Sequence, residues 1–276
     1  MPLLKPAIKE CNLKKFRGQT CVIDIMGWLY RGAFSSASNL GNGGAVNTLG
    51  YMNFPFKMLK LLLGFDIKPI CIFDGRPHEG KVEVEKKRSK DKAKNKALAN
   101  DAKKSGNLDD AKKFNQRCLF LKQKQIDLFI EILNEMSIDH YTAPYEADAQ
   151  MAYMVKEGIA DFAITEDSDL IAFGCNKLVL KMNHKGFGEL FDYDAFKNET
   201  NYKDWDDKLK TLQKMDRNQF LETLIMGGCE YIQSIDRVGL KVVLKNHAKH
   251  GSCEKVVKDL KANKLFKDRV PDDYWE

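Results

Sequence analysis

Short apolar runs that end in acidic residues recur along this chain. One run covers residues 20–24, a second covers residues 69–74, and a third, from Phe162 to Ile164, leads directly into a cluster of acids. Short apolar runs bounded by turn residues are typical of buried strands. Helical spacing separates the first two runs, with a helix expected near residues 51–63. The alternation predicts an α/β fold with a central, mostly parallel sheet.

A long polar segment rich in lysine and alanine interrupts the alternation after the second run. It contains no proline between Pro77 and Pro144, so long helices are possible there. The pattern predicts two or three helices, with a break near residues 105–107 and a last helix around 122–136. The chain therefore carries a basic helical insertion, at about 76–136, between its second and third acidic strands.

The second half of the chain returns to alternating elements. Short strands are expected across residues 138–192, and helices return after Asp216 with a turn near 235–239. No internal repeat is visible. We interpret the chain as one domain, 1–276, whose last helical segment covers about 216–276.

The acids that follow the third apolar run are the most informative feature. Glu166, Asp167 and Asp169 fall within four residues, with no Lys or Arg among them. Clustered carboxylates at the end of a buried strand repel one another and lose hydration, so a divalent cation is their natural partner. Ligands bind beyond the carboxyl ends of parallel strands, so acids at several such ends could converge in one cleft. The other candidates, at strand ends or a helix start, are Asp24, Asp74, Glu146 and Asp148.

Each acidic site also has a plainer interpretation. Asp after a strand commonly forms a turn or caps a helix, and for any single site this is the more common role. A turn needs only one acidic residue, however, whereas some of these sites contain two or more. Glu146 and Asp148 are two residues apart, so both can reach a cleft only from the first turn of a helix, where the helix dipole favours them. Oxygen ligands without His favour Mg²⁺ or Mn²⁺ over Zn²⁺.

The charge distribution adds a basic surface to this acidic cleft. The net charge is +6, but residues 81–124 hold fifteen Lys or Arg against six acids. A solvated helical face is the ordinary explanation of such a run. Beside an acidic metal cleft, it also suits a phosphodiester substrate, whose backbone the cations would hold. Residues 41–44 are glycine-rich but lack the following Lys-Ser/Thr of a phosphate loop, so ATP use is not indicated.

Composition limits the cellular setting. The chain has 276 residues and seven Cys without a Cys-x-x-Cys pair. No apolar run reaches membrane-spanning length, and the first residues show no signal-peptide pattern. We therefore expect a soluble, reduced, intracellular protein, cytosolic or nuclear, with no membrane association.

Two segments resemble the signature blocks of a known enzyme family. Residues 143–150 read Ala-Pro-Tyr-Glu-Ala-Asp-Ala-Gln, and residues 165–175 read Thr-Glu-Asp-Ser-Asp-Leu-Ile-Ala-Phe-Gly-Cys. They resemble the structure-specific 5′ nuclease family that includes flap endonuclease and exonuclease 1. Flap endonucleases usually carry Glu-Ala-Glu-Ala at the first block, so the resemblance is closer to the exonuclease 1 branch. It covers nearly the whole chain.

The resemblance implies a fold and an activity. The fold would be a PIN-like sheet with a helical arch in the basic insertion and a C-terminal helix-turn-helix segment of the H2TH type. The activity would be Mg²⁺-dependent 5′→3′ exodeoxyribonuclease on duplex DNA with 5′ ends, nicks or flaps, with 5′-flap cleavage. A monomer that acts in nuclear mismatch repair and recombination would follow, with mismatch-repair and sliding-clamp proteins as partners.

The resemblance also assigns site residues. The family places acids around two Mg²⁺ ions, for which Mn²⁺ can substitute, and this chain matches at Asp24, Asp74, Glu146, Asp148, Asp167 and Asp169. The arch cations that contact the scissile phosphate fall on Lys81 and Arg88, which are seven apart and so on one helix face. A DNA-stacking aromatic aligns with Tyr30, for which a plain core position is the alternative. The remaining expected DNA contacts are Lys86, Lys87, Arg237, Gly239 and Lys241.

The chain departs from the family pattern at three places. Glu230 stands where the family has Asp as its seventh metal ligand, which moves the carboxylate by about 1.5 Å. Arg237 replaces the first Gly of a Gly-x-Gly loop that binds a monovalent cation such as K⁺ and the DNA backbone. Arg does not readily adopt glycine backbone angles, so that ion site near Gly239 is in doubt. The family pattern also extends beyond this chain at both ends, so we expect a fragment.

Two other functions remain open from the residues alone. The departures would also fit a DNA-binding relative with a weakened active site. A metal-dependent phosphatase of small molecules would use similar acids, but it would leave the basic stretch at residues 81–124 without a role.

Overall fold

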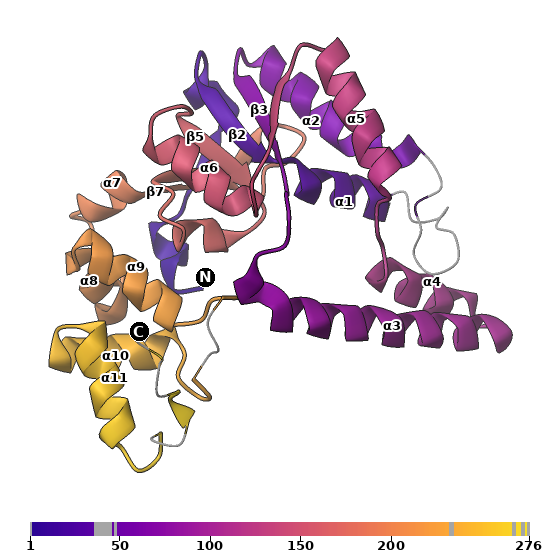
Figure 1. Cartoon of the computed structure of the whole chain (residues 1–276). Helices are drawn as coiled ribbons and strands as arrows, with labels where there is room; N and C mark the ends of the chain where they lie inside the picture. Colours follow the sequence, from indigo (N-terminus) through magenta and orange to yellow (C-terminus); the bar gives the residue numbers. More distant parts are fainter. Residues whose placement is uncertain are drawn as a thin grey trace.

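The computed structural model describes residues 2–35, 46, 49–231, 235–266, 269–271 and 274, so residues 41–44 fall outside it. In this part of the chain, seven strands form one sheet in the order β1-β7-β6-β5-β2-β3-β4 (Figure 1). Five neighbouring strands are parallel, namely β6 (Lys177–Leu180), β5 (Phe162–Thr165), β2 (Thr20–Asp24), β3 (Lys68–Phe73) and β4 (Asp139–Thr142). The predicted α/β class with a mostly parallel sheet is confirmed.

The edge of the sheet was not predicted in full. Strand β7 (Phe187–Asp192) runs antiparallel to both of its neighbours, β6 and the short β1 (Lys9–Asn12). Strand β1 has only four residues, of which only Cys11 is buried. Such a short polar strand carries no period-two pattern, which explains why the sequence did not reveal it.

Both faces of the sheet are buried, which accounts for the continuous apolar runs. Along β2, Val22 belongs to one core cluster and Ile23 to the other, because successive side chains point to opposite faces. One face is covered by α1 (Ile25–Ser35), α2 (Asn53–Gly64) and α5 (Gln123–Glu135). The other is covered by α6 (Ala147–Lys156), α7 (Tyr193–Lys197) and α8 (Asp207–Lys214). None of the described helices is both long and apolar enough to span a membrane.

The basic insertion divides into an extended part and a packed part. The short 3₁₀ turn η6 (Glu79–Lys81) leads into α3 (Val82–Lys104), and α4 (Leu108–Arg117) packs back against α3. In Figure 1, α3 extends to the right below the sheet and apart from it. By contrast, α5 belongs to the core, where Phe129 and Leu133 are fully buried. The expected helix break lies at the predicted place, where Asn107 caps α4.

The C-terminal helices have a small core of their own. Helix α9 (Arg217–Met226) begins at a capping box formed by Asp216 and Gln219. Helices α10 (Leu240–His250) and α11 (Cys253–Ala262) then pack together around buried side chains, among them Val243, Val256 and Val257. The predicted helices after Asp216 are confirmed.

Arg237 corrects one expectation from the sequence. Its backbone has φ +63°, the left-handed conformation that we expected an arginine to avoid. The neighbours Ile235 and Val238 are both buried in the C-terminal core, and their burial fixes the turn between them. Gly239, by contrast, is extended at φ −100°. The turn therefore keeps a glycine-like conformation at position 237 without a glycine.

Replacing Arg237 with glycine is expected to stabilise the protein by roughly 0.5 to 1 kcal/mol, because glycine adopts a positive φ without steric cost. Arg237→Ala removes the same guanidinium but keeps the strained backbone, so it should change the free energy of unfolding by less than about 0.5 kcal/mol. Chemical denaturation of the three proteins measures the difference. Equal stabilisation by both variants would mean that the side chain, and not its backbone conformation, limits stability.

Candidate active site

The predicted acids gather at the carboxyl end of the parallel strands. Strands β2 and β3 are in register with Asp24 beside Ile72, so Asp24 and Asp74 lie at neighbouring strand ends. A cavity of about 320 Å³ is lined there by carboxylates from five separate segments, namely Asp24, Asp74, Glu146, Asp148, Asp167 and Glu230. Asp169 lines an adjoining cavity of about 260 Å³, which shares Asp148 and Asp167 with the first.

Several of these acids also perform the plainer structural role. The Asp24 carboxylate accepts a hydrogen bond from the Gly27 N–H at 3.0 Å, at the start of α1. Asp74 accepts from the Ala147 N–H at 2.9 Å, at the start of α6. Capping and cleft formation are therefore not alternatives here: the helix N-termini fix the carboxylates at the edge of the cavity.

Two glycines allow the segments to approach. A Cβ at Gly75 would lie 1.9 Å from the Ala143 carbonyl oxygen, and the Gly75 N–H donates to the Tyr145 carbonyl at 2.6 Å. This contact draws the end of β3 against the segment that carries Glu146. After α9, Gly228 has φ +136°, which only glycine adopts without strain, and the turn delivers Glu230 to the cavity.

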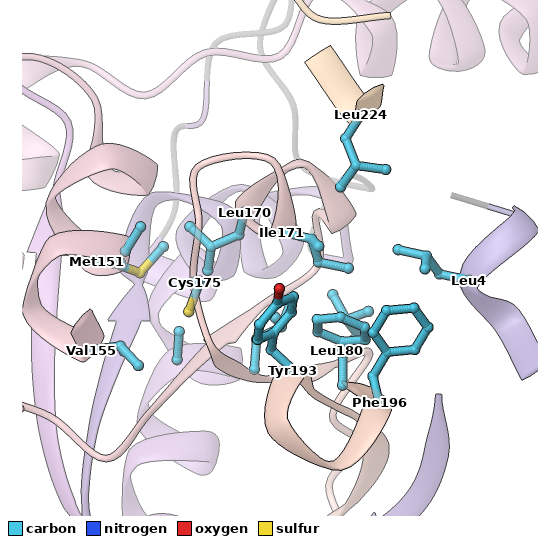
Figure 2. Close-up of a cluster of buried hydrophobic side chains, with 14 of the residues drawn as sticks. Leu4, Met151, Val155, Leu170, Ile171, Cys175, Leu180, Tyr193, Phe196 and Leu224 are labelled. Atoms are coloured by element: carbon cyan, nitrogen blue, oxygen red, sulfur yellow. The ribbon is translucent and has the colours of Figure 1, made fainter. Parts of the chain in front are cut away.

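The acidic loop after β5 is anchored by its own apolar residues. Leu170 and Ile171 are 0% and 1% exposed and end the short turn η7 (Ser168–Ile171) that follows Asp167. Figure 2 shows Leu170 and Ile171 in one buried cluster with Met151 of α6 and with Leu4 and Leu224. The burial of these side chains holds Asp167 and Asp169 at the cavity.

The carboxylates destabilise one another's charged forms. Burial, followed by repulsion from Asp24, Asp167 and Asp74, raises the pKa of Asp148 to about 7. Burial also raises the pKa of Asp24 to about 6, against the hydrogen bond from Gly27. The pKa of Asp169 is raised as well, by burial and then by Asp167. This part of the cavity lacks sufficient positive charge.

The donor set fits a hard divalent cation. The acids that line the two cavities all offer carboxylate oxygens, which Mg²⁺ and Mn²⁺ prefer. The raised pKa values of Asp24 and Asp148 indicate that a bound cation would relieve the repulsion between them. Within the described residues, however, no three acidic, His or Cys side chains already converge as a preformed metal site. The protein therefore supplies the candidate ligands around two adjoining cavities.

Lys81 provides the positive charge at the other side of the cavity. It is 9% exposed, and its Nζ lies 2.7 Å from Glu146 Oε2 and 2.8 Å from Glu230 Oε2. Burial alone would lower the pKa of Lys81, but the hydrogen bonds to both glutamates outweigh burial and raise this pKa. The ammonium also lies 4.7 Å from the centre of the Tyr231 ring.

Arg88 reaches the same carboxylate as Lys81. Its guanidinium donates from Nη2 to Glu230 Oε1 at 2.7 Å. We predicted that Lys81 and Arg88 share one face of a helix. Instead, Lys81 ends η6 and precedes α3, so the two residues do not lie on the face of one helix. The hydrogen bond from Lys81, with Arg88 adding to it, lowers the pKa of Glu230.

Two residues that contact acids of the site were not predicted from the sequence. The Tyr231 hydroxyl donates to Glu146, and burial and this hydrogen bond raise the pKa of Tyr231. Arg31 of α1 pairs with Glu166, next to Asp167, and stacks on Phe54. The position of Tyr231 directly after Glu230 was a usable signal, but the partner of Arg31 lies 135 residues away and no local pattern identifies it.

The expected DNA contacts lie on exposed surfaces. Tyr30 is 37% exposed, so the alternative of a plain core aromatic does not hold. Lys86 and Lys87 are exposed on α3. Three further residues lie around the start of α10, namely Arg237, Gly239 and Lys241. Their exposure is compatible with DNA contact, but it does not by itself test their roles.

Two family models match the chain around this site. The XPG N-terminal domain matches residues 1–95, and the XPG I-region matches residues 137–230. The chain belongs to the XPG family of structure-specific nucleases. The two matches together contain every acid of the cavity, as well as Lys81 and Arg88. XPG-family nucleases use divalent metal ions.

Curated relatives agree with this assignment. Exonuclease 1 of Danio rerio is 33% identical over 279 residues, which are 100% of this chain and 33% of that protein. The DNA damage-inducible protein DIN7 of Saccharomyces cerevisiae is 30% identical over 277 residues, which are 98% of this chain and 62% of that protein. The chain thus spans about a third of the length of the exonuclease 1 relative.

Solved structures share the fold. The catalytic core of Rad2 in complex with DNA substrate aligns with a TM-score of 0.65 and 22% identity, over 95% of this chain and 75% of that one. The junction-resolving enzyme GEN-1 binding with potassium aligns with a TM-score of 0.56 and 18% identity, over 96% and 53%. The chain therefore shares its fold with these two proteins, although the sequence identity is low.

Proposed function

We propose that this chain is an exonuclease 1-like, Mg²⁺-dependent 5′→3′ exodeoxyribonuclease that acts on duplex DNA and also cleaves 5′ flaps. The observation that carries the proposal is the cavity that carboxylates from five segments line together with the arch cations Lys81 and Arg88. Acidic side chains without enough neighbouring positive charge favour the binding of metal ions, and the two cations favour the binding of a phosphodiester. Repair of mismatched and recombining DNA in the nucleus is the corresponding cellular role.

The metal ions would bind between the acids that line the two adjoining cavities, namely Asp24, Asp74, Glu146, Asp148, Asp167 and Asp169. When bound, two ions there would activate the attacking water and stabilise charge on the leaving oxygen. Glu230 lines the same cavity but is held by Lys81 and Arg88. Mn²⁺ offers the same preference for oxygen ligands and should substitute for Mg²⁺.

The cationic side of the cavity would bind the scissile phosphate. Lys81 and Arg88 together present an ammonium and a guanidinium from the base of the arch, which suits an anion with several acceptor oxygens. Lys86 and Lys87, further along α3, would bind neighbouring phosphates of the backbone. Tyr30, on helix α1 that follows β2, offers an exposed ring on which a base could stack.

The C-terminal helices would hold the duplex away from the cut. Arg237 and Lys241 are exposed cations on either side of the N-terminus of α10, where backbone N–H groups favour phosphate. The left-handed backbone of Arg237 preserves the shape of this turn. We therefore propose a DNA backbone contact here, which a monovalent cation such as K⁺ would assist at Gly239.

Strand polarity is the direct test of the proposed activity. A duplex with a recessed 5′ end is labelled either at that end or at the 3′ end of the same strand. With Mg²⁺, the 5′ label should appear first in short products, while the 3′ label stays in long fragments until late. EDTA should stop both reactions. Early release of the 3′ label would contradict the proposed direction, and cleavage in EDTA would contradict the metal requirement.

A further inference from the structure

Both arch cations are bound by one carboxylate. Glu230 Oε2 lies 2.8 Å from Lys81 Nζ, and Glu230 Oε1 lies 2.7 Å from Arg88 Nη2. The Lys81 side chain is only 11% exposed, whereas that of Glu230 is 37% exposed. The contact closes the base of the arch onto the turn after α9, which lies 142 residues further along the chain than Arg88.

The arrangement copies the way in which cations bind a phosphate. Each carboxylate oxygen accepts from a different cation, as two oxygens of a phosphate group would. The donors of Lys81 are already committed to Glu146, to Glu230 and to the face of Tyr231. A phosphate can therefore be bound by Lys81 and Arg88 together only if one of these partners leaves.

Glu230 is the partner that is easiest to displace. Its side chain is about twice as exposed as that of Glu146, at 37% against 19%, so water can replace its lost contacts at lower cost. Glu146 also accepts from the Tyr231 hydroxyl, which holds it in place. Glu230 has no such second anchor among its described hydrogen bonds, which go to Lys81 and Arg88 alone.

We propose that Glu230 is an internal substitute for the scissile phosphate: it holds Lys81 and Arg88 in place in the free protein and is displaced when DNA binds. The inference rests on the proposed function, because it takes these two cations as the phosphate-binding pair. Glu230 is then a positioning residue that sets the affinity for substrate. An aspartate at this position would be shorter by about 1.5 Å, too short to satisfy both cations at these distances.

The first test uses the protein without metal or DNA. Hydrogen exchange of the amides of η6 and the first turns of α3 is measured for wild type and for Glu230→Gln, which keeps the length but loses the charge. Exchange there should become about tenfold faster in the variant. Glu85→Gln is the matched control, since Glu85 also contacts Arg88, at 3.5 Å, but does not contact Lys81 among the described ion pairs. Unchanged exchange in Glu230→Gln would overturn the proposal.

The second test measures DNA affinity in EDTA, with a duplex that carries a 5′ phosphate at a recessed end. Glu230→Gln should bind about three- to tenfold more tightly than wild type, because no internal anion competes for the cations. Glu85→Gln, which removes the same charge from the same cavity, should change affinity by less than about twofold. Equal gains in both variants would mean a general charge effect and would overturn the displacement.

The two tests separate this inference from the proposed function. If wild type neither binds nor cleaves DNA, the proposed function fails, and the displacement of Glu230 by DNA fails with it. Hydrogen exchange would still show whether Glu230 holds the base of the arch closed in the free protein. If wild type cleaves DNA but Glu230→Gln binds it no more tightly, only the displacement is overturned. Thermal unfolding of Glu230→Asp and Glu230→Gln confirms that both variants fold, and Glu230→Asp should also show faster exchange.

Discussion

Asp148→Asn is expected to abolish cleavage and at the same time to stabilise the metal-free protein. Asparagine cannot supply the charge that a divalent ion needs, so the cleavage rate should fall at least about a thousandfold. The pKa of Asp148 is raised to about 7 by burial and by Asp24, Asp167 and Asp74, so at pH 7.5 its charge weakens the folded state. Its removal should raise the midpoint of thermal unfolding by roughly 3 to 8 °C in EDTA.

The dependence on pH follows with a definite sign. A carboxyl whose pKa is raised on folding binds its proton more tightly in the folded state, so stability falls as pH rises from about 4 to about 7. Metal-free wild type should therefore be more stable at pH 5.5 than at pH 7.5, and Asp148→Asn should show a smaller difference. Asp91→Asn, at an exposed position of α3, is the control. A lower thermal midpoint for Asp148→Asn than for wild type in EDTA would refute this electrostatic account.

The second large effect is expected at the arch. Lys81→Ala should slow single-turnover cleavage by about 10²- to 10³-fold, because a positioned cation stabilises charge that develops on the phosphate in the transition state. DNA affinity should fall by no more than about threefold, since many other cations hold the backbone. Arg88→Ala should behave similarly, with a smaller loss of rate, because its side chain is 52% exposed against 11% for Lys81.

Lys90→Ala is the matched control for this prediction, because Lys90 lies on α3 with Arg88 and is exposed. It should leave the cleavage rate within about twofold of wild type. Rapid-quench cleavage and fluorescence anisotropy, run on the same duplex, provide the rate and the affinity. Equal losses of rate and affinity in Lys81→Ala would show that Lys81 binds substrate without assisting the chemical step.

The central sheet could be read from the sequence because its strands are buried on both faces. Continuous apolar runs mark β2, β3 and β5, and parallel strands necessarily place Asp24 and Asp74 at the same edge. The convergence of the acids followed from that topology. The predicted ligand set itself rests on the resemblance to the nuclease family, and it stays a prediction.

The remaining features depend on contacts that are distant in the sequence. The pairing of Lys81 with Glu146 and Glu230 joins segments 65 and 149 residues apart, which no local pattern encodes. The left-handed backbone of Arg237 could not be predicted locally, because the burial of its neighbours overrides the preference of the residue itself. Local sequence patterns were therefore sufficient to predict the strands, whereas the turn at Arg237 and the ion pairs of Lys81 depend on tertiary packing.

The most direct test of the central claim compares wild type with Asp169→Ala on one internally labelled duplex with a recessed 5′ end. Cleavage is measured with Mg²⁺, and DNA affinity is measured in EDTA. We predict that wild type releases label progressively from the 5′ end, whereas Asp169→Ala binds the duplex with similar affinity and releases none. Equal cleavage by both proteins, or binding by both without any cleavage by wild type, would contradict the account. The latter result would identify the chain as a DNA-binding relative without catalysis.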